Sequence, residues 1–527
     1  MIKTDITLPI KYKVSDIKEA ICKALPVSLN EISEPRLIKR TLTLNADTPA
    51  HYRATVAFSV GEERERGLLK IKRRVKEYEP FSYTPPHFCS DFRPVVVGFG
   101  PAGMFAALTL AEAGARPIVL ERGLDVDERR RTTDRFRLFG ILDPECNVQF
   151  GEGGAGTYSD GKLKVGAMDK YKAFVLDEFI RAGADESIAY STSAHLGTDK
   201  LSGIVKKIRQ RIIALGGEVR FGARLCELSA PEGQLRSVTY ECGTERVEVP
   251  TRAVILAVGH SARDTISMLY GKGLQVVPKG FGIGVRIEHP REYMNSVVYG
   301  KDASLISDTA SYHLVTHLGN GRSVYSFCMC PGGTVVAATG ESGAVVTNGM
   351  SEYARMGDNS NAALLVSVTP EDFPSDSPLA GIELQRSIER RAFSLTGEYR
   401  APAERLDCFM NGVRGSSFGS VKPSYERGVE HIPTDDYLPR YLTDSLRAAI
   451  PDFDAWLGGY YYPEAVITGP ETRTTSPIRF LREGTNMAEG FKGIFPAGEG
   501  AGYAGGIVSS ATDGIRTAEK LIEYYNS

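Results

Sequence analysis

The chain has 527 residues, 42% hydrophobic and 24% charged, which is the composition of an ordinary globular protein of about three domains. A net charge of −2 excludes a protein that binds nucleic acid or a membrane surface through bulk charge. Glycine is in excess, with 55 residues, roughly a tenth of the chain, against a typical ~7%. Only Gly61 and Gly67 lie in the first 90 residues. Because glycine lets backbone bend sharply or approach a ligand closely, the sequence predicts a glycine-poor leader and a ligand-centred body.

The cysteines and the N-terminus indicate the compartment. Eight cysteines without a C-x-x-C pair favour a reducing environment. The first residues lack the basic-then-apolar pattern of a secretory signal. The apolar run 94–114 is interrupted by three glycines and a proline, which is typical of a strand, a turn and a helix rather than a membrane span. We therefore expect a cytoplasmic protein without membrane contact.

Residues 1–80 are predicted to form a small N-terminal α+β domain, followed by a proline-rich linker over 79–94. The first 90 residues carry 16 Lys and Arg against 11 Asp and Glu. The densest basic run, 70–76, is more typical of the solvated face of a strand or helix than of a binding site for an anionic partner.

A dinucleotide-binding motif opens the body at Val95. A buried apolar strand leads into a G-x-G-x-x-G turn formed by Gly98, Gly100 and Gly103, then into an apolar helix and a second strand that ends at Glu121. These glycines permit the tight turn, the approach of backbone to a pyrophosphate and the packing of helix on strand. The helix N-terminus favours phosphate, and Glu121 can accept a hydrogen bond from a ribose hydroxyl.

Three further segments favour FAD over NAD. The loop 147–163 contains five glycines between Gly151 and Gly161, suited to wrap a flat ligand with backbone. A buried strand over Ala253–Gly259 follows a helix over 201–215 and a strand predicted over 218–225. At the C-terminus, Gly498 and Glu499 end a strand, and a paired glycine brings the helix 507–525 towards a ring that becomes anionic on reduction.

Together these motifs resemble the uncharacterised FAD-dependent dehydrogenases of the two-dinucleotide-fold flavoprotein superfamily. The resemblance rests on GFGPAG, GEGGAGTYSDGKL, AVILAVGHSARDT and GEGAGYAGGIVSSATDGI and extends over nearly the whole chain. It implies that the first motif and Glu121 hold the ADP half, that Leu225 contacts adenine and that the C-terminal motif holds the ribityl chain and the pyrimidine side of the flavin. The expected cofactor-binding residues are Gly98, Gly100, Pro101, Ala102, Gly103, Glu121, Arg122, Gly153, Gly154, Ala155, Gly156, Leu225, Gly259, Gly498, Glu499, Gly505, Gly506, Ile507 and Val508.

The expected fold class is α/β: a Rossmann-like FAD-binding domain with an inserted β-rich substrate or cap domain and the small N-terminal α+β domain. We assign residues 91–275 and 465–527 to the FAD-binding domain and 276–464 to the insertion. Gly280, Gly282 and Gly284 resemble a second nucleotide motif, but an extended stretch ending at Pro290 follows them instead of a helix. NAD(P)H is accordingly expected only as a transient reductant above the flavin.

Four residues are candidates for chemistry. Lys162 ends the glycine-rich loop and is either a group near the flavin N5 or a surface lysine. Cys328 and Cys330 are either redox-active or inert; at i and i+2 of an extended strand a disulfide is strained, which favours a Pro-Gly-Gly turn that presents backbone to the ligand. Arg473 either binds an anionic substrate group or forms an interdomain ion pair.

Other polar residues have mainly structural interpretations. His260 is favoured as a structural residue over an acid or base. His313 and His317 lie in a predicted strand with no third ligand spaced nearby, so no metal site is expected. The run 129–131 of three arginines is favoured as the solvated face of a helix over a position along the phosphates.

The sequence thus predicts an FAD-dependent oxidoreductase that transfers hydride between a non-covalent flavin and a small substrate. Two alternatives stay open: a flavoprotein that binds or modifies RNA through its basic N-terminal domain, and a flavin-binding sensor or scaffold without turnover. Nucleic acid is the disfavoured partner, and the substrate and the oligomeric state are left open.

Overall fold

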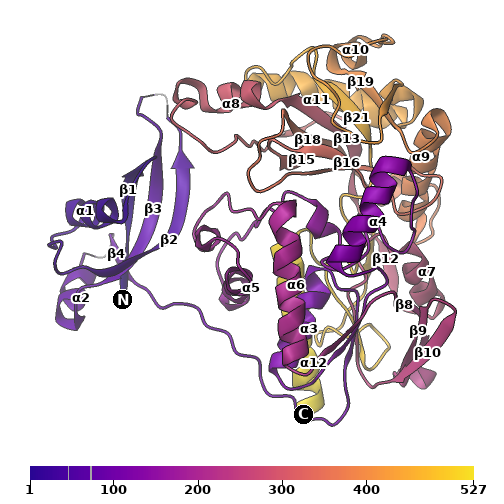
Figure 1. The fold of residues 1–527 in the computed structure, drawn as a ribbon, viewed down its shortest axis with the longest axis horizontal. Helices are drawn as coiled ribbons and strands as arrows, with labels where there is room; N and C mark the ends of the chain where they lie inside the picture. Colours follow the sequence, from indigo (N-terminus) through magenta and orange to yellow (C-terminus); the bar gives the residue numbers. More distant parts are fainter. Residues whose placement is uncertain (46, 72–73) are drawn as a thin grey trace.

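The computed structural model describes residues 1–45, 47–71 and 74–527 (Figure 1). Its N-terminal part is a four-stranded antiparallel sheet in the order β2-β3-β1-β4. Along β1, Ile2, Ile6 and Leu8 alternate with exposed residues and pack in one core with Ile17 and Ile21 of α1. Lys72 and Arg73 of the basic run lie outside the described residues. The elements are β1 (Ile2–Pro9), α1 (Val14–Ala24), β2 (Ser33–Thr43), β3 (His51–Ser59), α2 (Glu62–Leu69) and β4 (Val75–Glu77).

The body is built on a five-stranded parallel sheet in the order β23-β11-β5-β6-β7. Successive residues of β5 face opposite cores: Val96 packs under the helices, whereas Val95 and Val97 face the other side. The helices α3, α6 and α12 lie side by side on one face (Figure 1). The elements are β5 (Val95–Val97), α3 (Pro101–Glu112), β6 (Ile118–Leu120), α5 (Lys170–Arg181), α6 (Thr198–Ala214), β7 (Glu218–Arg220), β11 (Val254–Leu256), β23 (Ile494–Pro496) and α12 (Ile507–Asn526).

This topology confirms the predicted α/β fold class with a Rossmann-like domain. The chain leaves the central β5 in one direction towards β6 and β7 and returns on the other side to β11 and β23. Ligands of such sheets bind in the crevice at the carboxyl ends of the strands where this order reverses. The G-x-G-x-x-G turn follows β5 directly, at that crevice.

The strand predicted over 218–225 is wrong as a single element. It consists of β7 in the parallel sheet and the start of β8 (Arg224–Ser229) in a separate antiparallel sheet with β9 (Ser237–Cys242) and β10 (Glu245–Pro250). The chain turns between the two sheets at Gly222, whose φ of 63° lies in the left-handed region.

A seven-stranded sheet in the order β14-β15-β18-β13-β21-β19-β20 forms the second large core. Gly280 precedes β13, which carries Gly282 and Gly284 and pairs with β18 and β21 on its two sides. A Cβ atom on Gly284 would lie 1.9 Å from the carbonyl oxygen of Leu364, so this glycine lets two strands approach rather than serving a phosphate. The strands are β13 (Phe281–Pro290), β14 (Val315–His317), β15 (Ser323–Cys330), β18 (Asn359–Val368), β19 (Ala401–Arg405), β20 (Val429–His431) and β21 (Val466–Glu471), so the sheet extends beyond residue 464.

Helices and short strands surround these sheets. Helices α9 and α11 pack on strands of the seven-stranded sheet, and α7 packs on β8. None of the helices in the described ranges combines the length and the apolarity needed to span a bilayer. The remaining elements are α4 (Val126–Phe139), α7 (Arg263–Gly271), β12 (Val276–Pro278), α8 (Arg291–Tyr299), β16 (Thr334–Ala337), β17 (Thr347–Met350), α9 (Ala380–Thr396), α10 (Leu406–Asn411), α11 (Arg440–Trp456) and β22 (Ile478–Phe480).

The N-terminal domain docks on the body through the free edge of β2. The backbone N–H of Arg40 donates to the carbonyl of Tyr190 at 2.7 Å, and the N–H of Thr192 donates to the carbonyl of Arg40 at 3.1 Å. The Arg40 guanidinium lies over the rings of Tyr12, Tyr52 and Tyr190. This basic residue is therefore part of the interdomain contact.

Candidate flavin site

A long pocket opens at the switch point of the parallel sheet. Most of the predicted cofactor residues share its wall. Those on the wall are Gly98, Gly100, Pro101, Ala102, Glu121, Arg122, Gly154, Ala155, Gly156, Leu225, Gly259, Glu499, Gly505, Gly506, Ile507 and Val508. Gly103, Gly153 and Gly498 are not among the lining residues. Gly103 is a packing residue, since a Cβ there would lie 1.9 Å from the carbonyl oxygen of Gly98.

Glu121 ties together the two glycine-rich loops of the pocket. Its Oε2 accepts from the N–H of Phe99 at 2.7 Å, and its Oε1 accepts from the N–H groups of Gly123 and Gly151 at 2.9 Å each. A carboxylate has about four acceptor directions, so three backbone bonds leave one on Oε2. That remaining direction suits a ribose hydroxyl and agrees with the role expected of Glu121.

Arg129 is buried, and its position differs from the one predicted. Its guanidinium donates to the carbonyls of residues 147, 148, 151, 152 and 154, at 2.7–3.3 Å. All three guanidinium nitrogens have carbonyl partners, so Arg129 clamps the glycine-rich loop instead of contacting phosphate or solvent. Its neighbours Arg130 and Arg131 are exposed, as predicted. The solvated position expected of Arg129 within the run 129–131 is therefore wrong.

Arg122 lies on the wall but is already paired. It donates to both carboxylate oxygens of Asp264 at 2.9 and 3.1 Å and to Glu145 at 2.9 Å, and its guanidinium lies 4.2 Å from the ring centre of Phe150. Arg224 also donates to Asp264, at 3.1 Å. These contacts fix the side chain of Arg122 on the wall that the buried Leu225 also lines.

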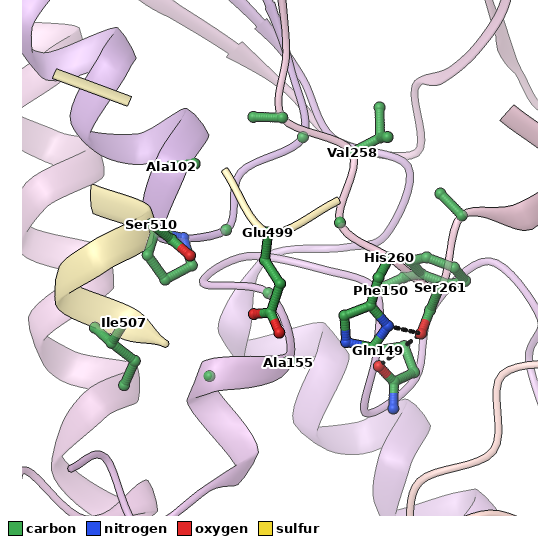
Figure 2. Close-up of a pocket in the computed structure, with 18 of the residues that line it drawn as sticks. Ala102, Gln149, Phe150, Ala155, Val258, His260, Ser261, Glu499, Ile507 and Ser510 are labelled. Atoms are coloured by element: carbon green, nitrogen blue, oxygen red, sulfur yellow. Dashed lines mark hydrogen bonds between the residues drawn. The ribbon is translucent and has the colours of Figure 1, made fainter. Parts of the chain in front are cut away.

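The C-terminal motif brings a helix end to the pocket. Gly505, Gly506 and Ile507 begin the 20-residue helix α12, whose free N–H groups and positive dipole end suit an anionic ring or phosphate. The Glu499 carboxyl group points into the pocket between Ala155 and His260 (Figure 2). Burial raises the pKa of Glu499 to about 8, so at neutral pH it is largely protonated and can donate a hydrogen bond.

Five polar side chains form what we call the polar wall: Lys162, His260, Cys328, Glu471 and Arg473. Burial lowers the pKa of Lys162 and raises that of Glu471 to about 8. Burial, with the charges of Arg473 and Arg263, lowers the pKa of His260 to about 3, so its imidazole is neutral around pH 7. Ser261 contacts His260 Nδ1 at 3.4 Å and donates to Gln149 at 3.0 Å (Figure 2).

Arg473 forms an ion pair between distant segments, one of the two interpretations that its sequence allowed. Its Nε and Nη2 donate to Glu389 of α9 at 3.1 and 2.9 Å, and Arg263 of α7 donates to the same carboxylate at 2.8 and 2.9 Å. Arg473 also lines the pocket, and its buried Nη1 finds no hydrogen-bond partner among the described residues. The residue is thus anchored by Glu389, with the N–H groups of Nη1 left over.

Two partners of Asp160, Arg355 and Ser351, were not anticipated. Asp160 accepts from Arg355 at 2.9 and 2.5 Å and from the hydroxyl of Ser351 at 2.7 Å. It lies two residues before Lys162 in sequence, and its charge opposes the effect of burial on the pKa of that lysine. Nearly 200 residues separate Asp160 from Arg355, so no local signal in the sequence marks the pair. Cys330 is buried and is not among the lining residues.

The described residues fit FAD. The Gly100 and Gly154 backbones face each other so closely that a Cβ on Gly154 would lie 2.9 Å from the Cα of Gly100. Two helix N-termini, those of α3 and α12, border the same pocket. Within the described ranges, no group of three or more His, Cys, Asp or Glu side chains is arranged to hold a metal ion. The donor set therefore suits phosphates, a ribose and a flat ring.

A parallel sheet with a switch-point crevice, a glycine wall and two helix N-termini defines a dinucleotide-binding protein of the FAD type. Residues 280–474 match the family described as "FAD-dependent protein, C-terminal domain-like". An uncharacterised protein from Clostridium beijerinckii is 43% identical over 534 residues, which cover 99% of this chain and 98% of the relative. The chain belongs to the same family as this relative, a family of FAD-dependent proteins.

Solved structures with some likeness to the chain include a dehydrogenase and a reductase-like protein. A 3-ketosteroid dehydrogenase from Rhodococcus jostii has 12% identity and a TM-score of 0.35, covering 84% of this chain and 100% of its own. A geranylgeranyl bacteriochlorophyll reductase-like protein from Thermoplasma acidophilum has 11% identity and a TM-score of 0.36, covering 82% and 79%. At these scores the likeness says nothing of activity, and the fold rests on the sheet topology described above.

Proposed function

We propose that the protein is an oxidoreductase that transfers hydride between a non-covalently bound FAD and a small substrate at the polar wall. The observation that carries this proposal is one continuous pocket lined both by residues 98–102 of the nucleotide turn and by the polar wall. When bound, FAD supplies the two-electron chemistry, and the protein binds, orients and tunes. The substrate itself is unassigned.

The chain's own groups suit this task. The N-terminus of α12 favours negative charge on the ring edge beside Gly505 and Gly506. The largely protonated Glu499 can donate a hydrogen bond into the same space. Lys162 lies on the pocket wall and would hold a positive charge or a proton near the reacting atoms.

Arg473 of the polar wall is the group proposed to bind the substrate. Arg473 keeps its Nη1 without a partner among the described residues, and a guanidinium donor of this kind suits a carboxylate or another anion. NAD(P)H is proposed as a transient electron donor, since the nucleotide turn belongs to FAD and Gly282 and Gly284 lie inside a strand.

The test is anaerobic mixing of the purified, FAD-loaded protein with NADH and with NADPH, followed at the flavin absorbance band. Rapid bleaching by either nucleotide supports an oxidoreductase with that donor. Protein that neither retains FAD nor binds it from solution would contradict the proposal. A retained flavin that neither nucleotide reduces would contradict the choice of donor and favour the sensor or scaffold.

The RNA alternative has a separate test. Arg40, one of the basic residues of the N-terminal domain, is occupied by Tyr12, Tyr52 and Tyr190, which reduces the charge available to a polyanion. RNA binding by the full chain that falls steeply with salt would favour this alternative. Absence of retention on RNA at low salt would remove it.

A further inference from the structure

Two thiols lie next to each other at the polar wall. Cys328 lines the pocket, and Cys330 lies fully buried behind it. The Cys330 thiol donates to the carbonyl oxygen of Cys328 at 3.4 Å. Neither cysteine is in a disulfide in this structure. One thiol therefore faces the pocket, and a second thiol is held against the backbone of the same residue.

The backbone at these cysteines is not extended, which removes the objection raised from sequence. Cys328 has φ of 39°, in the left-handed region that a non-glycine residue rarely adopts. The pairing of β15 with β18 shifts register between Phe327 and Cys330, so a bulge lies there. Met329 turns into the core. The expectation that i and i+2 stand apart on one face of a regular strand is wrong here.

The alternative that the Pro-Gly-Gly turn presents backbone to the ligand is also wrong. Residues 331–333 are buried and do not appear on the pocket wall. A Cβ on Gly332 would lie 1.8 Å from the carbonyl oxygen of Arg355, and one on Gly333 would lie 2.2 Å from that of Met350. The turn packs against protein rather than presenting backbone to a ligand.

Arg286, Lys162 and Asp160 act on the charge of the thiols. Arg286 Nη1 donates to the Cys328 carbonyl at 2.8 Å while its Nε pairs with Glu471 at 2.8 Å. The hydrogen bond from Cys330, opposed by burial and helped by Arg286 and Lys162, lowers the pKa of Cys328 to about 6. The pKa of Cys330 is raised, first by its bond to Cys328. Around pH 7 the pair is one thiolate at the pocket and one thiol behind it.

We propose that Cys328 and Cys330 form a dithiol–disulfide couple that exchanges an electron pair with the bound flavin. The proposal rests on the proposed function because it needs that flavin. In the oxidising direction the Cys330 S–H bond breaks and an S–S bond forms to Cys328. The electron pair and the Cys330 proton pass to the oxidised flavin, which becomes the reduced anion; the reverse transfer restores the thiols.

Peptide mapping of the full chain tests the couple without relying on turnover. The FAD-loaded protein is oxidised with ferricyanide, quenched in acid, alkylated and digested. The expected result is a peptide containing both cysteines that escapes alkylation and has lost two hydrogens, about 2 Da. Prior reduction with dithionite should make both sulfurs alkylatable. Two alkylated sulfurs after oxidation would overturn the proposal.

Anaerobic reductive titration provides the second test. The oxidised wild type should take up about four electrons per flavin, and Cys328→Ser and Cys330→Ser about two each, because each disulfide is a two-electron couple. Cys408→Ser, at a buried cysteine of α10 away from the pocket, should behave as the wild type. Uptake of two electrons by the wild type would overturn the couple and leave the flavin function intact. Failure to bind flavin would instead contradict the proposed function.

Discussion

The two walls of the pocket are built by different means. The nucleotide wall, formed by the turn Gly98–Gly103 with Glu121, presents backbone N–H groups and a carboxylate whose bonds are nearly all filled. The polar wall presents buried ionisable side chains, several with strongly shifted pKa values and one with an unpaired donor. The first wall is suited to hold a ligand in one position, and the second to respond to charge.

The difference between the two walls indicates that the nucleotide wall binds the ligand and that the polar wall carries the chemistry. Shifted pKa values and strained backbone gather where groups must change charge or react. On the polar wall, Cys328 combines a left-handed φ with a neighbouring thiol, whereas Arg129 behind the nucleotide wall has ordinary helical surroundings and a full set of partners. Substitutions should therefore separate loss of FAD from loss of reactivity.

The largest effect is expected for Arg129→Ala. It leaves five backbone carbonyls of the glycine-rich loop without their donor, and breaking such a buried charged network costs about 3–5 kcal/mol. We expect a lower free energy of unfolding in urea and loss of bound FAD. Arg130→Ala removes an exposed neighbour on the same helix and should leave both unchanged. Equal effects of the two variants would contradict the clamp.

Glu389→Gln should come next. The carboxylate serves both Arg263 and Arg473, and removing its charge leaves two buried guanidiniums poorly paired, at a cost of about 3 kcal/mol or more. Burial raises the pKa of Glu389, but Arg473 and Arg263 outweigh it and the pKa falls below the ordinary 4.5. A lowered carboxyl pKa stabilises the fold above 4.5, and this contribution is lost as the pH falls below that value.

Urea unfolding between about pH 3 and pH 7 measures this loss. The wild type should lose stability steeply on acidification, and Glu389→Gln should start lower and fall less. Glu383→Gln, an exposed acid on the same helix, is the control and should follow the wild type. A Glu389→Gln curve parallel to that of the wild type would show that the ion pair does not set the acid limit.

Two alanine substitutions in the nucleotide turn should distinguish a glycine needed for packing, Gly103, from a glycine needed for ligand approach, Gly100. Gly103→Ala places a Cβ 1.9 Å from the Gly98 carbonyl oxygen, so it should destabilise the fold by about 1–3 kcal/mol. Gly100 has φ of −75°, and a Cβ there has 3.7 Å to its nearest neighbour, so Gly100→Ala should fold normally. It should nevertheless weaken FAD binding, because the methyl group occupies the approach to the pyrophosphate.

Thermal unfolding without added flavin and titration with FAD separate the two outcomes. Gly103→Ala should melt earlier, and Gly100→Ala should melt as the wild type does but require more FAD for saturation. If Gly100→Ala bound FAD as tightly as the wild type, Gly100 would not be the point of closest approach.

The nucleotide wall was predictable because its signals are local. The spacing of Gly98, Gly100 and Gly103 and the acid at the end of the next strand are fixed by one strand–turn–helix unit. Arg129 was missed although a signal exists: Val126, Arg129, Thr133 and Phe136 follow helical spacing and are all buried. A helix that begins after the cap at Asp125 places Arg129 on the same buried face as Val126, Thr133 and Phe136, so its burial could have been predicted.

The polar wall was only partly predictable. Lys162, Cys328 and Arg473 were identified as candidates. The residues that hold them or their neighbours, Arg355 at Asp160, Arg286 at Cys328 and Glu389 at Arg473, come from segments far apart in the chain. No periodicity encodes such pairs. The bulge at Cys328 was missed because a strand sequence carries no mark of an extra residue when none is a glycine.

The smallest effect is expected for Glu499→Gln, at the border of the two walls. Burial raises the pKa of Glu499 to about 8. A raised carboxyl pKa means that the folded state holds a proton that the unfolded state releases, so stability falls as the pH rises between about 5 and about 8. Gln has the shape of the neutral acid and does not titrate, so the variant should lose less stability over this range.

Urea unfolding at saturating FAD measures how steeply the free energy of unfolding falls with pH, with Glu489→Gln, at an exposed acid, as the control. Glu471 keeps its own raised pKa of about 8, so the slope should shrink without vanishing. An unchanged slope would mean that Glu499 is ionised in the filled pocket and accepts, rather than donates, its hydrogen bond there.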